Sequence, residues 1–477
     1  MATSPPVVLI TVDCLRADHV GFNGYSRPTT PFLDSLAAEG TVFSNAIVAG
    51  TPTYYSFPGI MASRYPLALG RDVVGLAPGE PTIATALKDA GYATGAFLAG
   101  NPYLSPQFGY DAGFDTFHDF LDAELPPLHD GVATAGTTNL RSRLNRRLDE
   151  ISHQLGPLGT VYDELYFRYG QRNASPVESM NALRRFPAAD RIVDEASAWL
   201  AAVGDKPFFL WLHLMDPHAP YYPTEKGLEL MGDDISPERA RFQNSYWNRA
   251  LNTDRFTRYL QPITALYDAG IRWVDAQVER LVQTLRRSER WQNCVFALTA
   301  DHGEQFLDHG DRYHAPTKLT EEVIRVPLLV RVPGQEHATV RAPFSLLHLA
   351  PTLLDAARVS VPKDFHGQIG GEAAAVVECV AGCNNPYRAG DRMGARILAV
   401  REDRYKLTVD FGSKQVSLFD LERDPRELRP IPEREAKPER HRLLGRARQH
   451  LENSQRDVDA GRRLDMRLRD LRLEWSA

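Results

Sequence analysis

The chain is poor in cysteine and has no long hydrophobic run. Only four of its 477 residues are cysteine, too few for the disulfide framework of a small secreted domain. No apolar stretch approaches the roughly eighteen residues that span a membrane. The N-terminus lacks a basic region, an apolar stretch and a cleavage site in series, so we expect no secretory leader. These absences favour a cytoplasmic protein with reduced thiols and no transmembrane segment.

Positive charge is not in excess either. The 55 lysine and arginine residues are outnumbered by 61 acidic residues, for a net charge of −6. Such a chain has no overall positive field to attract phosphate backbones, so we expect no nucleic-acid partner. With 43% hydrophobic and 24% charged residues, it can bury a sizeable core.

Apolar runs of strand length alternate with stretches of helical periodicity along most of the chain. Because strands and helices that alternate in this way build a mostly parallel sheet, the pattern predicts an α/β fold whose mixed sheet is sandwiched by helices. We expect strands that end at Asp13 and Asp301 and others at 93–99, 207–214 and 327–331. We expect helices near 30–39, 81–90, 190–202, 262–287 and 345–356.

The pattern changes towards the C-terminus. The segments ILAVRED, YKLTVDFGS and QVSLFDLE are typical of short antiparallel strands. We therefore divide the chain into a main domain at 1–375, a small antiparallel subdomain at 376–430 and a charged helical tail at 431–477. A helical insertion near 121–185 has a hydrophobic stripe that fits a lid or a homo-oligomer contact. Its arginines Arg141, Arg143, Arg146 and Arg147 fit the alternative, a basic surface for an anionic substrate or lipid headgroup. The stripe consists of Leu140, Leu144, Leu148, Ile151 and Leu155.

Two strand-length runs stop at side chains that bind metals. VVLITVD ends at Asp13, and CVFALTADHG carries Asp301 and His302. Ligands collect at the carboxyl ends of strands in an open α/β sheet, so both runs deliver these residues to one rim. Carboxylate and imidazole together suit a divalent cation. Asp13 as a helix cap and His302 as a surface residue is the plainer alternative.

Five segments in the same order resemble the sulfatase branch of the alkaline phosphatase superfamily, which includes sulfatases, phosphonate monoester hydrolases and phosphodiesterases. The resemblance runs from Val7 to about Leu428 and implies a hydrolase of sulfate or phosphate esters with a metal-bound hydroxyl nucleophile. The segments are TVDCLRADHVGFNGYSRPTTPFLDSLAAEGTVFSNA, FLWLHLMDPHAPYYP, ALTADHGEQFLDHG, EEVIRVPLLVRVPG and SLFDLERDPREL.

The nucleophile segment departs from the sulfatase pattern. Sulfatases carry a CxPxR or SxPxR motif whose first residue becomes formylglycine, and the alignment of SFPGIMASRYP places Thr53 there. Threonine cannot form this aldehyde, but related phosphodiesterases and transferases use it as nucleophile, because a cation can lower the pKa of its hydroxyl. Ser56 is the fallback nucleophile, and a helix N-cap is the structural alternative for Thr53.

The resemblance implies one divalent metal ion held by Asp13, Thr53, Asp301 and His302. Mn²⁺ or Zn²⁺ is favoured over Mg²⁺ or Ca²⁺, because imidazole is a poor ligand for hard cations. Many relatives have a second acid where this chain has Cys14, which we interpret as a core thiol in preference to a ligand.

Further site residues follow from the resemblance. The relatives use the histidine that matches His218 at the leaving group, where an imidazole can protonate a departing alkoxide. A lysine near Lys318 would stabilise charge on the transferred group, and His314 or His309 could replace it. His213, Asn101 and His314 are expected to contact the substrate, although a packed histidine and a turn-forming Asn-Pro are the alternatives for the first two.

The sequence therefore predicts a metal-dependent hydrolase of small anionic esters, most specifically phosphodiesters or phosphonate monoesters. A sulfatase without formylglycine, a phospho-group transferase and a non-catalytic binding protein are the alternatives. Retention of Asp13, Asp301 and His302 together argues against the last.

Overall fold

The computed structural model describes residues 4–121, 167–168, 176–248, 257–316 and 319–454. Its centre is an eight-stranded sheet in the order β12-β2-β11-β7-β1-β6-β4-β5. Strands β7, β1, β6, β4 and β5 run parallel, whereas β11 is antiparallel to both of its neighbours. The strands are β1 (Val7–Val12), β2 (Thr41–Phe43), β4 (Ala93–Leu98), β5 (Thr116–His118), β6 (Phe208–Leu214), β7 (Val295–Ala300), β11 (Leu328–Arg331) and β12 (Ala338–Val340).

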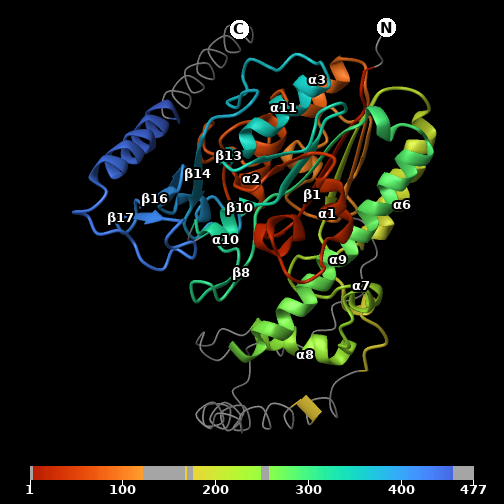
Figure 1. The fold of residues 1–477 in the computed structure, drawn as a ribbon, viewed down its shortest axis with the longest axis horizontal. Helices are drawn as coiled ribbons and strands as arrows, with labels where there is room; N and C mark the ends of the chain where they lie inside the picture. The colour runs from red at the N-terminus through yellow and green to blue at the C-terminus, as the bar shows by residue number, and fades with distance from the viewer. Residues whose placement is uncertain (1–3, 122–166, 169–175, 249–256, 317–318, 455–477) are drawn as a thin grey trace, which may run out of the picture.

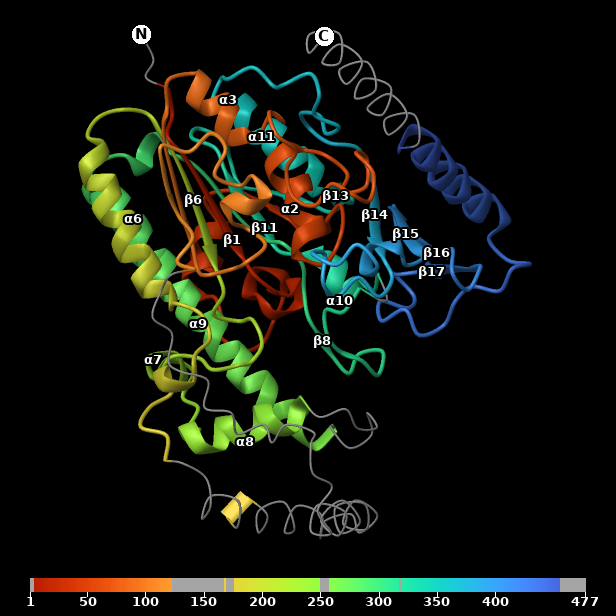
Figure 2. The same ribbon diagram turned by 180° about the vertical axis from the view of Figure 1, so that it is seen from behind.

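Helices cover both faces of this sheet (Figures 1 and 2). The long helices α6 and α9 lie on one face, and α2, α3 and α11 lie on the other. The predicted mostly parallel α/β sandwich is confirmed. The helices are α1 (Pro31–Ala37), α2 (Thr53–Ala62), α3 (Ile83–Asp89), α6 (Ala189–Val203), α7 (Glu225–Met231), α8 (Pro237–Trp247), α9 (Thr257–Arg287), α10 (Glu321–Ile324) and α11 (Leu349–Ala356).

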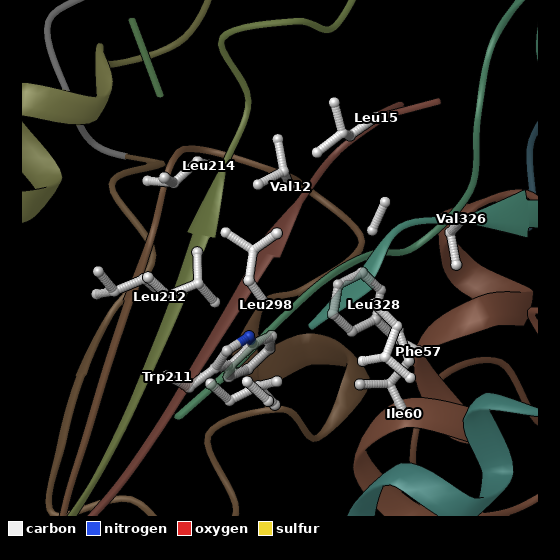
Figure 3. Close-up of a cluster of buried hydrophobic side chains, with 14 of the residues drawn as sticks. Val12, Leu15, Phe57, Ile60, Trp211, Leu212, Leu214, Leu298, Val326 and Leu328 are labelled. Atoms are coloured by element: carbon white, nitrogen blue, oxygen red, sulfur yellow. The ribbon is translucent and has the colours of Figure 1, made fainter. Parts of the chain in front are cut away.

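The central strands read as continuous apolar runs because both of their faces are buried. Every residue of β1, β6 and β7 is buried. Figure 3 shows Trp211 of β6 and Leu328 of β11 near Phe57 and Ile60 of α2. The rings of Phe57 and Trp211 lie 5.6 Å apart. This packing fixes the first turn of α2 against the sheet.

Strand register brings the carboxyl ends of the central strands to one level. Val12 at the end of β1 stands opposite Leu214 of β6 and Ala300 of β7. Leu98 at the end of β4 stands opposite His213 of β6. Residues that follow these positions therefore meet at one rim of the sheet.

A smaller antiparallel sheet lies towards the C-terminus, as predicted. It consists of β14 (Ala374–Val380), β15 (Arg396–Glu402), β16 (Tyr405–Asp410) and β17 (Gln415–Asp420) in that order. A helix at 437–454 packs on it through Leu443 and Ala447. The short strands β3 (Ala46–Ile47), β10 (Arg325–Val326) and β13 (Phe344–Ser345) form a third sheet, and β8 (Gln305–Phe306) pairs with β9 (Arg312–Tyr313).

Three further expectations bear on the fold. All four cysteines are free and buried. No described helix is both long enough and apolar enough to cross a membrane. The hydrophobic stripe predicted in the insertion, from Leu140 to Leu155, lies outside the described residues.

Candidate active site

The two acidic strand ends meet at the rim. Asp13 follows β1, and Asp301 and His302 follow β7. His302 Nε2 lies 3.5 Å from Asp301 Oδ2 and 3.9 Å from Asp13 Oδ1. All three side chains are fully buried. The predicted convergence of these residues therefore exists in the fold.

Thr53 joins them from the other side as the first residue of α2. Its hydroxyl lies 3.2 Å from His302 Nε2. Pro52, and not Thr53, occupies the N-cap position of α2. The cap alternative for Thr53 therefore finds no support. We call Asp13, Thr53, Asp301 and His302 the acid–imidazole centre.

Local structure fixes the orientation of His302. Its Nδ1 lies 2.9 Å from the Gly303 carbonyl oxygen, so a proton there leaves Nε2 free to face Thr53 and the aspartates. A Cβ at Gly303 would lie 2.0 Å from the Glu322 carbonyl oxygen. Only glycine therefore allows this close backbone approach.

Asn101 and His213 hold Asp13 in place. Asn101 Nδ2 donates to Asp13 Oδ2 at 2.9 Å, while its Oδ1 accepts from the Tyr103 backbone N–H. Asn101 thus contacts the site through Asp13 and also stabilises the local turn, the alternative that the sequence suggested. His213 Nε2 lies 3.4 Å from Asp13 Oδ2, and its Nδ1 lies 3.0 Å from the Thr11 hydroxyl.

His213 is fully buried and is absent from the described residues that line the nearby cavity. Its contacts are with Asp13 and Thr11, so it positions a carboxylate. This arrangement fits the packed-histidine alternative, and the substrate contact of His213 stays a prediction.

The two aspartates have opposite electrostatic behaviour. Burial raises the pKa of Asp13, but His218, His213 and His302 more than offset it and hold the pKa well below its usual range. Burial and the charge of Asp13 raise the pKa of Asp301. One carboxylate is thus ready to bind a cation, and the other needs one in order to ionise freely.

The residues fit a divalent metal ion. Asp301 Oδ2 is buried without a hydrogen-bond partner, an expensive arrangement that a cation would relieve. Two carboxylates, a hydroxyl and an imidazole form a mixed oxygen and nitrogen donor set that suits Mn²⁺ or Zn²⁺. The acid–imidazole centre would hold that ion.

A cavity of about 390 Å³ opens over Thr53. Its polar lining includes Asn101, His218 and His314, and the rest is mainly aromatic or apolar. Burial raises the pKa of nearby Glu304, but His314, 3.3 Å away, more than offsets it and keeps the carboxyl ionised. The remaining lining residues are Pro52, Tyr54, Pro102, Tyr103, Phe186, Met215, Tyr313, Ala315, Pro316 and Asn384.

Other predicted residues lie elsewhere. Lys318 is outside the described residues. His309 pairs with Glu322 at 2.8 Å and does not line the cavity. The hydroxyl of Ser56 is buried without a hydrogen-bond partner, and Ser56 is not among the described lining residues either.

Sequence reasoning missed Glu304 and the aromatic wall. Glu304 follows His302 by two residues in the same loop, and this short spacing was the sequence feature that could have identified it. Tyr103, Phe186 and Asn384 come from three distant segments, and no local pattern marks them. A larger cavity of about 1100 Å³, lined by Arg325, Arg341 and Arg401 among others, contains none of the site residues.

This fold, with acids and imidazole at the sheet rim beside a hydroxyl on a helix start, defines an ester hydrolase of the alkaline phosphatase type. The chain belongs to the Sulfatase family, whose sequence profile matches residues 5–359. A second profile, for the C-terminal part of N-sulphoglucosamine sulphohydrolase, matches residues 311–457.

Individual relatives are distant but cover most of the chain. An arylsulfatase of Clostridium perfringens is 25% identical over 89% of this chain and 89% of its own length. A choline-sulfatase of Rhizobium meliloti is 24% identical over 90% and 82%. The solved phosphonate monoester hydrolase of Agrobacterium radiobacter has a TM-score of 0.66 at 19% identity, covering 95% of this chain and 96% of that one. This last likeness concerns the fold.

Proposed function

We propose that the protein hydrolyses phosphate esters, either phosphodiesters or phosphonate monoesters, with Thr53 as nucleophile. The observation that carries the proposal is the Thr53 hydroxyl at the cavity floor, 3.2 Å from His302 Nε2. No cysteine or serine is available at this position for conversion to formylglycine. The likeness to a phosphonate monoester hydrolase fold agrees with this chemistry.

A divalent cation in the acid–imidazole centre would lower the pKa of the Thr53 hydroxyl and offset charge on the transferred group. Thr53 Oγ1 attacks phosphorus, and the bond from phosphorus to the leaving oxygen breaks. Water then attacks the phosphothreonine, releases the product and restores the hydroxyl. Asn101 and His213 keep Asp13 oriented throughout.

His218 is the proposed proton donor to the leaving oxygen. It lines the cavity, and its Nδ1 lies against the Ala219 carbonyl, which leaves Nε2 for the substrate. His314, held by Glu304, is the proposed contact for a non-bridging oxygen. Lys318 remains a proposed charge-stabilising residue. The free, buried thiols support a cytoplasmic location as a further proposal.

Turnover of matched esters tests the proposal. Phosphodiester and phosphonate ester turnover should exceed aryl sulfate turnover. Co-expression with the formylglycine-generating enzyme should change neither rate. A clear preference for sulfate esters would instead favour the second candidate, a sulfatase with an unmodified hydroxyl, which the names of the arylsulfatase and choline-sulfatase relatives support.

A further inference from the structure

A second set of potential metal ligands lies beside the acid–imidazole centre. Cys14 Sγ lies 3.4 Å from His314 Nδ1. One ligand atom from each of Cys14, His218 and His314 lies within 4.8 Å of the other two. A tetrahedral zinc ion with bonds of about 2.3 Å to sulfur and 2.0 Å to nitrogen keeps those ligands about 3.5 Å apart. We call Cys14, His218 and His314 the thiol–imidazole trio. The distance between Cys14 Sγ and His314 Nδ1 is close to the distance that these two atoms would have as ligands of one zinc ion.

The trio is held in place by contacts outside it. Cys14 has a left-handed backbone with φ 60°, which is uncommon for a non-glycine residue. Its N–H donates to Asp301 Oδ1 at 3.3 Å, and its carbonyl accepts from the Tyr267 hydroxyl at 2.6 Å. His218 Nδ1 lies against the Ala219 carbonyl. A carbonyl behind one ring nitrogen is the usual arrangement of an imidazole that binds metal through the other.

Glu304 is an independent sign that a cation belongs here. Its carboxyl is fully buried, with Oε1 3.3 Å from His314 Nδ1. Its Oε2 has no hydrogen-bond partner. A buried carboxylate oxygen without a partner is costly, and a cation at the trio would compensate its charge.

We propose that Cys14, His218 and His314 bind a second, thiophilic divalent cation such as Zn²⁺. The site adjoins the acid–imidazole centre, because Cys14 also lies within ligand distance of Asp13 and His302. Its sulfur and imidazole ligands discriminate against Mg²⁺ and Ca²⁺. In the free protein the Cys14 thiol donates to Asp13 Oδ1 at 3.0 Å. Binding breaks the S–H bond, forms a bond from sulfur to the metal and releases the proton to solvent.

Occupancy of this site has a consequence for catalysis that rests on the proposed function. An ion on His218 takes the lone pair that would otherwise carry the proton for the leaving group. The same ion withdraws His314 from the substrate. Zinc in excess therefore inhibits an enzyme whose acid–imidazole centre is already filled by Mn²⁺.

Cobalt titration of the metal-free full-length protein tests binding without reference to activity. Co²⁺ bound to a thiolate has a sulfur-to-metal charge-transfer absorption in the near ultraviolet. We expect two equivalents of Co²⁺ to bind and the absorption to appear with the second. Saturation at one equivalent of Co²⁺ would overturn the proposal. An absorption that grows with the first equivalent would also overturn it, because it would show that the thiolate binds the first ion.

Variants assign the ligands. Cys14→Ala and His314→Gln should each lose the second equivalent and the absorption while they keep the first. Cys294→Ala removes a buried thiol that directly precedes β7, at the opposite end of the strand from Asp301. It should keep both the second equivalent and the absorption. Survival of the absorption in folded Cys14→Ala overturns the proposal. If Cys14→Ala does not fold, His314→Gln alone tests the proposal. Binding of the second equivalent of Co²⁺ to His314→Gln as to wild type would then overturn it.

An activity arm separates the two proposals. With Mn²⁺ present, added Zn²⁺ should lower wild-type turnover at least about tenfold, whereas His314→Gln should keep its own starting rate. Equal inhibition of both proteins would refute inhibition through this site. If no phosphate ester is turned over at all, the proposed function fails, but the cobalt titration still decides whether the second site exists.

Discussion

Two buried clusters of charge in this molecule are built in different ways. In one, the junction cluster, two acids from the main domain and the C-terminal segment are paired with two bases from the small sheet. Lys406 Nζ lies 2.7 Å from Glu427 and 3.4 Å from Glu321, and Arg401 lies 3.5 Å from Glu321. In the other, the acid–imidazole centre, the two carboxylates have imidazoles as their ion-pair partners and neutral donors, among them Asn101 and Cys14, as hydrogen-bond partners.

The difference separates structure from function. Each charge of the junction cluster has an opposite charge, from lysine, arginine or glutamate, within 3.5 Å, so the cluster needs no added cation to offset its charge. At the rim, the ion pairs of the two aspartates are with His213 and His302, and the charge of Asp13 raises the pKa of Asp301. A protein tolerates such an arrangement where a cation or a substrate completes it. A buried charge that lacks a compensating opposite charge therefore marks the site better than burial alone.

The largest expected effect is at Asp301. Asp301→Asn removes an anionic ligand while it keeps the shape of the side chain. Turnover should fall by more than about 10³-fold, and one equivalent of tightly bound metal should be lost by elemental analysis. The metal-free variant should melt no lower than metal-free wild type, because the repulsion from Asp13 is relieved. A lower melting temperature of the metal-free variant would show that Asp301 stabilises the metal-free fold. The acid–imidazole centre would then not differ from the junction cluster in this respect.

Thr53 gives the next effect in size. Thr53→Ala should lose turnover almost completely, with a change in the free energy of unfolding of about 1 kcal/mol, the usual size for a single substitution, because Thr53 is not the N-cap of α2. Metal binding should weaken because the hydroxyl is a ligand. Thr53→Ser keeps the attacking oxygen and should retain measurable turnover.

Ser56→Ala is the matched control for the nucleophile, three residues away on α2. It should change turnover little. The crossed result, with activity in Thr53→Ala and loss in Ser56→Ala, would make Ser56 the attacking residue.

The junction cluster predicts the opposite behaviour. Lys406→Met leaves Glu321 and Glu427 buried without their main partner, which should cost about 3–5 kcal/mol of stability. Turnover per folded molecule should stay unchanged at a temperature where the variant is folded. Denaturant unfolding and steady-state kinetics measure the two effects. Lys226→Met, at an exposed pair with Glu229, is the control and should shift stability by less than about 0.5 kcal/mol.

The sequence predicted the fold well where periodicity is strong. The buried strands around Leu9, Leu210 and Leu298 have apolar runs that only a sheet covered on both faces accommodates. Helix α9 was predicted from its apolar stripe but begins at Thr257, before the expected start at 262, because Pro262 is tolerated within its first turns. Strand β14 was not predicted, although Val376, Val377 and Val380 in Ala374–Val380 are residues that favour a strand.

From the pattern of residues alone, the site was predictable where chemistry follows a strand end, whereas Thr53, Asn101, His218 and His314 were named from the family resemblance. Asp13, Asp301 and His302 each stand directly after a buried run, so the rim could be inferred. Nothing local distinguishes Cys14 as a ligand from Cys14 as a core thiol, because the difference lies in His314, 300 residues away in the chain. The position of His213 on β6 was open for a similar reason, because strand alternation alone does not tell which residues its side chain will face.

The smallest effect concerns a partly buried pair, His309 with Glu322, and it shows how pairing responds to pH. The hydrogen bond to Glu322 raises the pKa of His309 against the opposing effect of burial. A histidine whose pKa is raised in the folded state stabilises it fully below the unfolded pKa of about 6.5, and that contribution is lost as pH rises through the folded pKa. His309→Gln should therefore cost about 1 kcal/mol near pH 5.5 and less near pH 9, measured by denaturant unfolding. In a Glu322→Gln background the same substitution should show a weaker pH dependence, because the largest of the interactions that raise the pKa of His309 is gone and the charge of Glu427 remains. A difference between wild type and His309→Gln that stays constant with pH would mean that the pair contributes through packing, and that titration of His309 is not coupled to folding.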